Sequence, residues 1–165
     1  QSHLDWVLIW AALPHDLRAG TRPIAARDYW TSSRFKQWLT SEVFHAVYVS
    51  RQRSDEQDPL EPLVEALQAG DSLVIFPEGT RSLKGEPLPF KSGLYHLARQ
   101  FPDVRLIPAW IDNVQRVMPK GEVVPVPILC TVTFGAPLAL HDGEDRRDFL
   151  DRARAAVLAL RPPAP

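Results

Sequence analysis

Cysteine is almost absent from the sequence, with Cys130 alone among 165 residues. A lone cysteine cannot form a disulfide within the chain. Its place in the apolar run Ile128–Val132 favours a buried packing role over a nucleophilic one. The five histidines show no spacing that would complete a zinc site with this cysteine. The sequence therefore argues against a disulfide-stapled fold and against a cysteine–histidine zinc centre.

The sequence also lacks an excess of charge and a long apolar run. Its net charge is -1, with 19 basic and 20 acidic residues, so no basic field points to nucleic acid as a partner. The apolar stretch Trp6–Pro14 is well short of the ~20 residues that a membrane-spanning helix needs. No signal peptide is visible, because Gln1 opens directly on a motif. This abrupt start predicts that a further strand, and a possible membrane-anchoring segment, precede the sequence.

The length suits one domain with a sizeable core. Sixteen prolines, nearly double the usual share of about 5%, gather at residues 87–89, 119–127 and 162–165 and predict stiff loops and an extended tail. We expect an α/β fold, a mostly parallel or mixed sheet flanked by helices. It would form a single domain over residues 1–160, followed by a proline-rich tail at 161–165.

Apolar runs of strand length alternate with segments of helical periodicity, which is the pattern of such a fold. Strands are predicted at residues 21–26, 46–49, 73–76, 104–111 and 128–134. Helices are predicted at residues 6–13, 28–44, 58–69, 91–99 and 145–160.

The stretch Ser72–Gly93, SLVIFPEGTRSLKGEPLPFKSG, is the centre of the functional interpretation. Its apolar start, Leu73–Phe76, predicts a buried strand ended by Pro77, which has no N–H to donate. A carboxylate, a glycine, a hydroxyl, a guanidinium and a second hydroxyl follow: Glu78, Gly79, Thr80, Arg81 and Ser82. Glycine lets backbone N–H groups approach a ligand, and arginine offers a planar donor fork that suits phosphate. Strand ends of open α/β sheets commonly bind ligands, but a polar turn with an internal Glu–Arg pair fits these residues equally well.

Three motifs carry a family resemblance. FPEGTRS at residues 76–82, QSHLD at Gln1–Asp5 and PFKSG at Pro89–Gly93 stand in this chain. They resemble the phosphate-binding block, the end of the NHxSxxD block and the FKxG block of the glycerolipid acyltransferases, the 1-acylglycerol-3-phosphate acyltransferase family. The order of the motifs is the same, and the resemblance runs from the first residue to about Phe134. The catalytic histidine of the family would fall immediately before Gln1.

The resemblance implies a transfer of a fatty acyl group from acyl-CoA or acyl carrier protein to the hydroxyl of a lysophosphatidic acid-like acceptor, in phospholipid biosynthesis. It implies a catalytic Asp5 that orients a histidine, which in turn takes a proton from the acceptor hydroxyl. It implies a substrate-binding set of Glu78, Gly79, Thr80, Arg81, Ser82, Arg51, Lys91 and Gly93. No metal or organic cofactor is implied. Asp5 also stands at or near the start of a predicted helix, where a carboxylate can act as a simple cap.

Arg51 and Lys91 lie outside FPEGTRS. Arg51 follows a predicted strand, and βα alternation would place it with Arg81 at one edge of a parallel sheet, where two guanidiniums suit one phosphate. Arg53 is the alternative to Arg51. Lys91 precedes a predicted helix whose free N–H groups form an anion site.

A lipid acceptor implies a membrane surface as a partner, and we expect a peripheral or anchored location at the cytoplasmic face. The aromatic and basic residues of Asp28–Phe44 fit core packing first and a membrane interface second. One rival function is a catalytically inactive module that binds a phosphate or lipid headgroup, because the catalytic histidine is not in this chain. The other is a phosphatase or nucleotide-binding enzyme. The sequence contains neither GxxxxGKS/T nor a DxD-type cluster that would support it.

Overall fold

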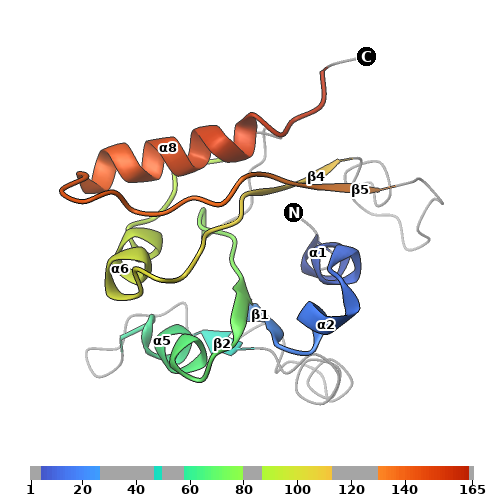
Figure 1. Cartoon of the computed structure of the whole chain (residues 1–165), viewed down its shortest axis with the longest axis horizontal. Helices are drawn as coiled ribbons and strands as arrows, with labels where there is room; N and C mark the ends of the chain where they lie inside the picture. Colours follow the sequence, from blue (N-terminus) through green and yellow to red (C-terminus); the bar gives the residue numbers. More distant parts are fainter. Residues whose placement is uncertain (1–4, 27–46, 50–57, 80–86, 113–129, 164–165) are drawn as a thin grey trace. The chain divides into compact units, whose positions relative to one another are not determined.

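The computed structural model describes residues 5–26, 47–49, 58–79, 87–112 and 130–163 (Figure 1). The chain divides into two compact units. The first, here called the sheet unit, is Leu13–Ile75, and the second, the terminal unit, combines Gln1–Ala12 with Phe76–Pro165.

The sheet unit is built on three parallel strands in the order β2-β1-β3. These are β1 (Thr21–Ala26), β2 (Val47–Val49) and β3 (Ser72–Val74). Helix α5 (Glu61–Gln68) packs against β2 and β3 and buries Leu63 and Ala66. A short helix, α2 (His15–Arg18), precedes β1. All three strands and α5 occur where the sequence predicts them, although α5 begins a few residues later and β3 ends earlier than expected.

The predicted end of β3 was wrong. The Cα pairing of β1 with β3 stops at Pro23–Val74, and the next residue of β1, Ile24, pairs with Val47 of β2. The ladder with β1 therefore ends at Val74, three residues before Pro77. The missing N–H of Pro77 does not set this end. Pro23, the last residue of β1 that pairs with β3, is fully buried.

The terminal unit contains two antiparallel strands, β4 (Ala109–Asp112) and β5 (Thr131–Phe134). Helix α8 (Arg146–Leu158) packs on β4 and on α6 (Gly93–Gln100), whereas α1 (Asp5–Ala12) packs on both strands (Figure 1). The centre of the helical packing is Phe149, which is fully buried and meets the ring of Tyr95 edge-on at 6.0 Å between centroids. The expected α/β fold is confirmed, with the antiparallel pair in addition to the parallel strands.

The strand predicted over Val104–Ile111 is shorter than expected. Leu106 forms only an isolated bridge with Leu138, and β4 begins after the buried Pro108. Proline cannot donate to a ladder, so pairing resumes beyond it. The helix expected over Asp28–Phe44 and the loop over Asn113–Pro127 lie outside the described residues. Among the described residues, we find no helix with the length and apolar character needed to cross a bilayer.

Candidate functional site

The first part of FPEGTRS forms a tight turn, Phe76–Gly79, here called the Glu78 turn. The Gly79 N–H donates to the Phe76 carbonyl at 3.1 Å. Gly79 has a φ of +65°, a left-handed conformation that costs other L-residues roughly 1–2 kcal/mol. This conformation explains the glycine at this position of the motif.

Glu78 points into the protein and is 6% exposed. Its Oε2 accepts a hydrogen bond from the Leu88 N–H at 2.7 Å. A buried carboxylate needs such donors to offset its lost hydration. Glu78 thereby ties the turn to residues on the far side of the intervening segment 80–86.

Lys91 lies directly against the Glu78 turn. Its backbone N–H donates to the Pro77 carbonyl at 2.8 Å. Its side chain covers Gly79, since a Cβ added there would be 2.8 Å from Lys91 Cε and 3.3 Å from Nζ. Lys91 is nonetheless an exposed residue. The turn thus carries an accessible ammonium group above the backbone of Gly79, and a side chain at this position would displace the end of Lys91.

Gly93 is the first residue of α6, two positions after Lys91. The Lys91–Pro77 hydrogen bond therefore brings the start of α6 next to the Glu78 turn. The Ser92 side chain makes no capping hydrogen bond to the described residues. Backbone N–H groups and the helix dipole make this end of α6 attractive to an anion.

Asp5 is the first residue of α1 and is only 4% exposed. The expected place at the start of a helix is confirmed, and the helix dipole there favours a charged carboxylate. Asp5 belongs to the same terminal unit as the Glu78 turn. Its proposed role toward a histidine stays a prediction.

The structure therefore brings Glu78, Gly79, Lys91 and Gly93 together. The other predicted substrate-binding residues lie outside the described part of the chain: Thr80, Arg81, Ser82 and Arg51. Their meeting at one phosphate stays a prediction, as does the choice between Arg51 and Arg53.

Sequence reasoning missed Arg154 of α8. Its Nε and Nη2 both donate to the Pro87 carbonyl, at 3.0 and 2.7 Å. Arg154 lies four residues after Leu150, at the edge of the apolar face of α8, so a half-buried arginine was detectable. Its partner, 67 positions earlier, was not.

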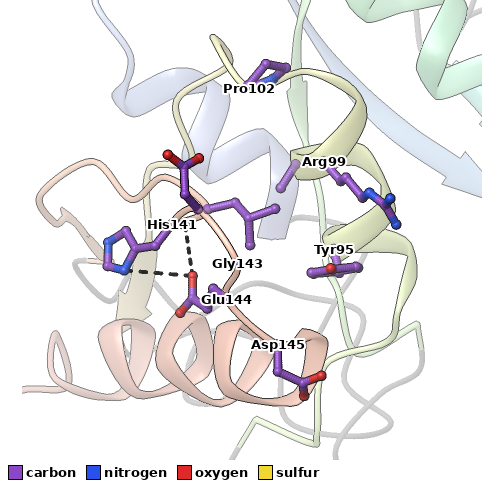
Figure 2. A pocket seen from close by; sticks show the side chains of 10 residues that line it. Tyr95, Arg99, Pro102, His141, Gly143, Glu144 and Asp145 are labelled. Carbon is purple, nitrogen blue, oxygen red and sulfur yellow. Dashed lines mark hydrogen bonds and ion pairs between the residues drawn. The ribbon is translucent and has the colours of Figure 1, made fainter.

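A second feature is an open hollow of about 560 Å³ beside α6 and the turn that precedes α8 (Figure 2). Its lining mixes Arg99 and His141 with the acidic residues Asp142, Glu144 and Asp145. Figure 2 shows His141 and Glu144 joined on its wall. No cluster that could hold a metal occurs among the described residues.

The Glu144 carboxylate is hydrogen-bonded to neighbouring groups of the protein. Arg152 donates to both carboxylate oxygens, each at 2.7 Å, and the His141 N–H adds a bond at 3.0 Å. The Arg152 hydrogen bond is the largest cause that lowers the pKa of Glu144 to about 2. A carboxylate so paired is a structural anion and a poor proton donor at neutral pH.

Known proteins resemble this chain in sequence and in structure. It is 35% identical to a 1-acyl-sn-glycerol-3-phosphate acyltransferase from Cocos nucifera, over 68% of this chain and 39% of that protein. It is 33% identical to 1-acyl-sn-glycerol-3-phosphate acyltransferase alpha from Homo sapiens, over 97% of this chain and 56% of that protein. The chain thus spans about 39–56% of the length of these relatives.

Among solved structures, the 1-acyl-sn-glycerophosphate (LPA) acyltransferase PlsC from Thermotoga maritima matches with a TM-score of 0.71. The sequences are 22% identical, and the match covers 97% of this chain and 63% of that one. At this identity the likeness establishes the fold. The family model described as Acyltransferase matches residues 1–112, more than half of the chain, and the chain therefore belongs to the acyltransferase family.

Proposed function

We propose that this chain forms the acyl-transfer part of an enzyme that acylates a lysophosphatidic acid-like acceptor. The donor is a thioester, either acyl-CoA or acyl carrier protein. The observation that carries the proposal is the Glu78 turn, where a left-handed glycine, an exposed lysine and a helix start converge. The relatives from Cocos nucifera and Homo sapiens are named as 1-acyl-sn-glycerol-3-phosphate acyltransferases.

The acceptor phosphate would bind at this turn. The Lys91 ammonium and the start of α6 supply positive charge beside the Glu78 turn. Arg81, Arg51, Thr80 and Ser82 are proposed to complete the set. Fixing the phosphate converts a free encounter into an oriented one, which can contribute several kcal/mol to the rate.

The chemistry would be a direct acyl transfer. A histidine, oriented by Asp5, takes the proton of the acceptor hydroxyl as its oxygen attacks the thioester carbonyl. A C–O bond forms and the C–S bond breaks, and the proton passes to the departing thiolate. Burial and the helix dipole suit Asp5 to balance the positive imidazolium. No serine or cysteine nucleophile is required.

The acceptor is a lipid, so we place the site at a membrane surface, at the cytoplasmic face. Two observations in the terminal unit support the membrane surface, and the cytoplasmic face is proposed from the reaction alone. After Asp5, α1 carries no charged residue over Trp6–Ala12. Ile107 and Phe134, 47% and 38% exposed, are large apolar residues near the paired ends of β4 and β5. These two side chains are the contact points that we propose for the bilayer.

The test is thiol release by the full-length protein from oleoyl-CoA and from an oleoyl carrier protein. Lysophosphatidic acid, lysophosphatidylcholine and monoacylglycerol serve as acceptors. We expect thiol release with lysophosphatidic acid and little with monoacylglycerol, which lacks the phosphate. Binding of lysophosphatidic acid without any thiol release would replace the enzyme with a headgroup-binding module. Equal use of monoacylglycerol would remove the phosphate site from the proposal.

Vesicle flotation tests the membrane location. The protein should float with vesicles of phosphatidylcholine containing lysophosphatidic acid, and a variant with Ile107→Ser and Phe134→Ser should float less. Failure of the wild-type protein to float would contradict the location without touching the reaction.

A further inference from the structure

We infer that Arg154 is a positioning residue for the acceptor-phosphate site. It would hold the segment Pro87–Lys91, here called the return arm, in the geometry that presents Lys91. This inference rests on the proposed function, because it assigns Arg154 a purpose at the same site.

Arg154 and Glu78 bind opposite sides of one peptide group, the one that joins Pro87 and Leu88. The Pro87 carbonyl accepts both hydrogen bonds of Arg154. The N–H of the same peptide bond, on Leu88, donates to Glu78 Oε2 at 2.7 Å. Because a peptide group is planar and rigid, rotating it would break the contacts at both ends. The guanidinium and the carboxylate also polarise the peptide in the same sense, which strengthens each bond.

This fixed peptide leads within a few residues to Lys91. Pro87 and Pro89 lock two φ angles of the return arm and limit its bending. At its other end, the Lys91 N–H is bound to the Pro77 carbonyl at 2.8 Å. The position of the Lys91 ammonium over Gly79 therefore depends on two anchor points, and Arg154 supplies one of them. In this way α8, far along the chain, sets the geometry of the motif.

Arg152 gives a matched control on the same helix. It lies two residues before Arg154 but donates to Glu144 and to the Ala139 carbonyl. Its hydrogen bonds to the described residues hold the turn before α8, and none of them reaches the return arm. Loss of either arginine should destabilise α8 packing, but only loss of Arg154 should disturb Lys91.

The experiment compares Arg154→Met, Arg154→Lys and Arg152→Met in the full-length protein. The thiol-release assay gives KM for lysophosphatidic acid and for oleoyl-CoA, and thermal unfolding gives Tm. We expect Arg154→Met to raise the acceptor KM about 10-fold, as for loss of hydrogen bonds from a charged donor. The donor KM should stay within twofold. Arg154→Lys, which keeps one donor group, should restore part of the acceptor KM and covers the case in which Arg154→Met does not fold.

Titration calorimetry with lysophosphatidic acid below its micellar concentration separates this inference from the proposed function. If the wild type binds the lipid without releasing thiol, the proposed reaction fails. Weaker binding by the Arg154 variants alone would then still support positioning. The inference is overturned if Arg154→Met and Arg152→Met change acceptor KM or affinity equally. It is also overturned if the Arg154 variants change neither, or if the wild type does not bind the lipid.

Discussion

Two turns of the terminal unit contain similar residues but differ in what those residues contact. The Glu78 turn and the turn His141–Glu144 are each closed by a backbone hydrogen bond, at 3.1 and 3.0 Å. Each joins a glutamate to a left-handed glycine, with φ of +65° at Gly79 and +73° at Gly143. Each also depends on an arginine of α8: Arg152 binds the second turn directly, and Arg154 binds Pro87 of the return arm, whose Lys91 contacts the first.

The difference lies in what the arginine binds. Arg152 takes the carboxylate of Glu144 itself, and no described atom lies within 4 Å of a Cβ added at Gly143. Arg154 takes a backbone carbonyl, while the Lys91 side chain covers Gly79. One turn uses its charges to stabilise the fold. The other is fixed through its backbone and presents an exposed ammonium, which is the arrangement that a ligand site needs.

The largest effect should separate two carboxylates, Asp5 and Glu144. Asp5→Asn in the full-length protein should lower kcat by about 10²–10⁴-fold, because the amide cannot balance an imidazolium and favours the wrong tautomer. Asn and Asp are comparable at helix starts, so Tm should move little. Glu144→Gln should leave kcat near that of the wild type. Unfolding of Asp5→Asn, or unchanged turnover, would make Asp5 a structural cap.

The next effect concerns the cations proposed for the phosphate. Arg81→Ala should weaken binding of the acceptor by roughly 2–5 kcal/mol if Arg81 pairs with a desolvated phosphate. Lys91→Ala should cost about 1.5–3 kcal/mol, as for a single charged donor. Both should affect the acceptor KM more than the donor KM. An exposed arginine of α8, Arg147, is the control, and Arg147→Ala should change neither. If the folded Arg81→Ala variant keeps the wild-type KM for the acceptor, Arg81 does not bind the phosphate.

The same residues show how much of the fold and of the site could be predicted from the sequence. Local periodicity predicted β1, β2, α5 and α8, because each element has an apolar face that its own residues reveal. The motif predicted that Gly79 and Lys91 belong to one site, and the structure brings them into contact. The end of β3 and the hydrogen bonds from Arg154 to Pro87 could not be predicted from the sequence. They depend on where β1 stops pairing with β3, at Pro23, and on a contact between residues 67 positions apart in the chain.

The two glycines offer a smaller but sharper comparison. Gly79→Ala and Gly143→Ala should each lose roughly 1–2 kcal/mol of unfolding free energy from the left-handed backbone. Gly79→Ala should also push the Lys91 side chain aside and raise the acceptor KM several-fold, while Gly143→Ala should not.

A double-mutant cycle tests this reason. In a Lys91→Ala background, Gly79→Ala should affect the acceptor KM less, because the displaced side chain is already gone. Additive effects of the two substitutions would show that Lys91 does not act through its contact with Gly79.

The smallest expected effect is the pH dependence of stability at the turn His141–Glu144. The pKa of Glu144 is lowered from 4.5 to about 2 in the folded protein. Because the folded pKa lies below the unfolded one, its stabilising contribution is complete above about pH 4.5 and is lost as the pH falls toward 2. The Tm difference between wild type and Glu144→Gln should therefore be constant above pH 5 and shrink between pH 4.5 and 2. The effect should be modest, since the Arg152 side chain is 30% exposed and water screens the pair. Arg152→Gln should reduce this acid dependence too, because it removes the main cause of the shift. A Tm difference that does not change with pH would mean that Glu144 holds its turn by packing, and the contrast drawn with the Glu78 turn would lose its electrostatic basis.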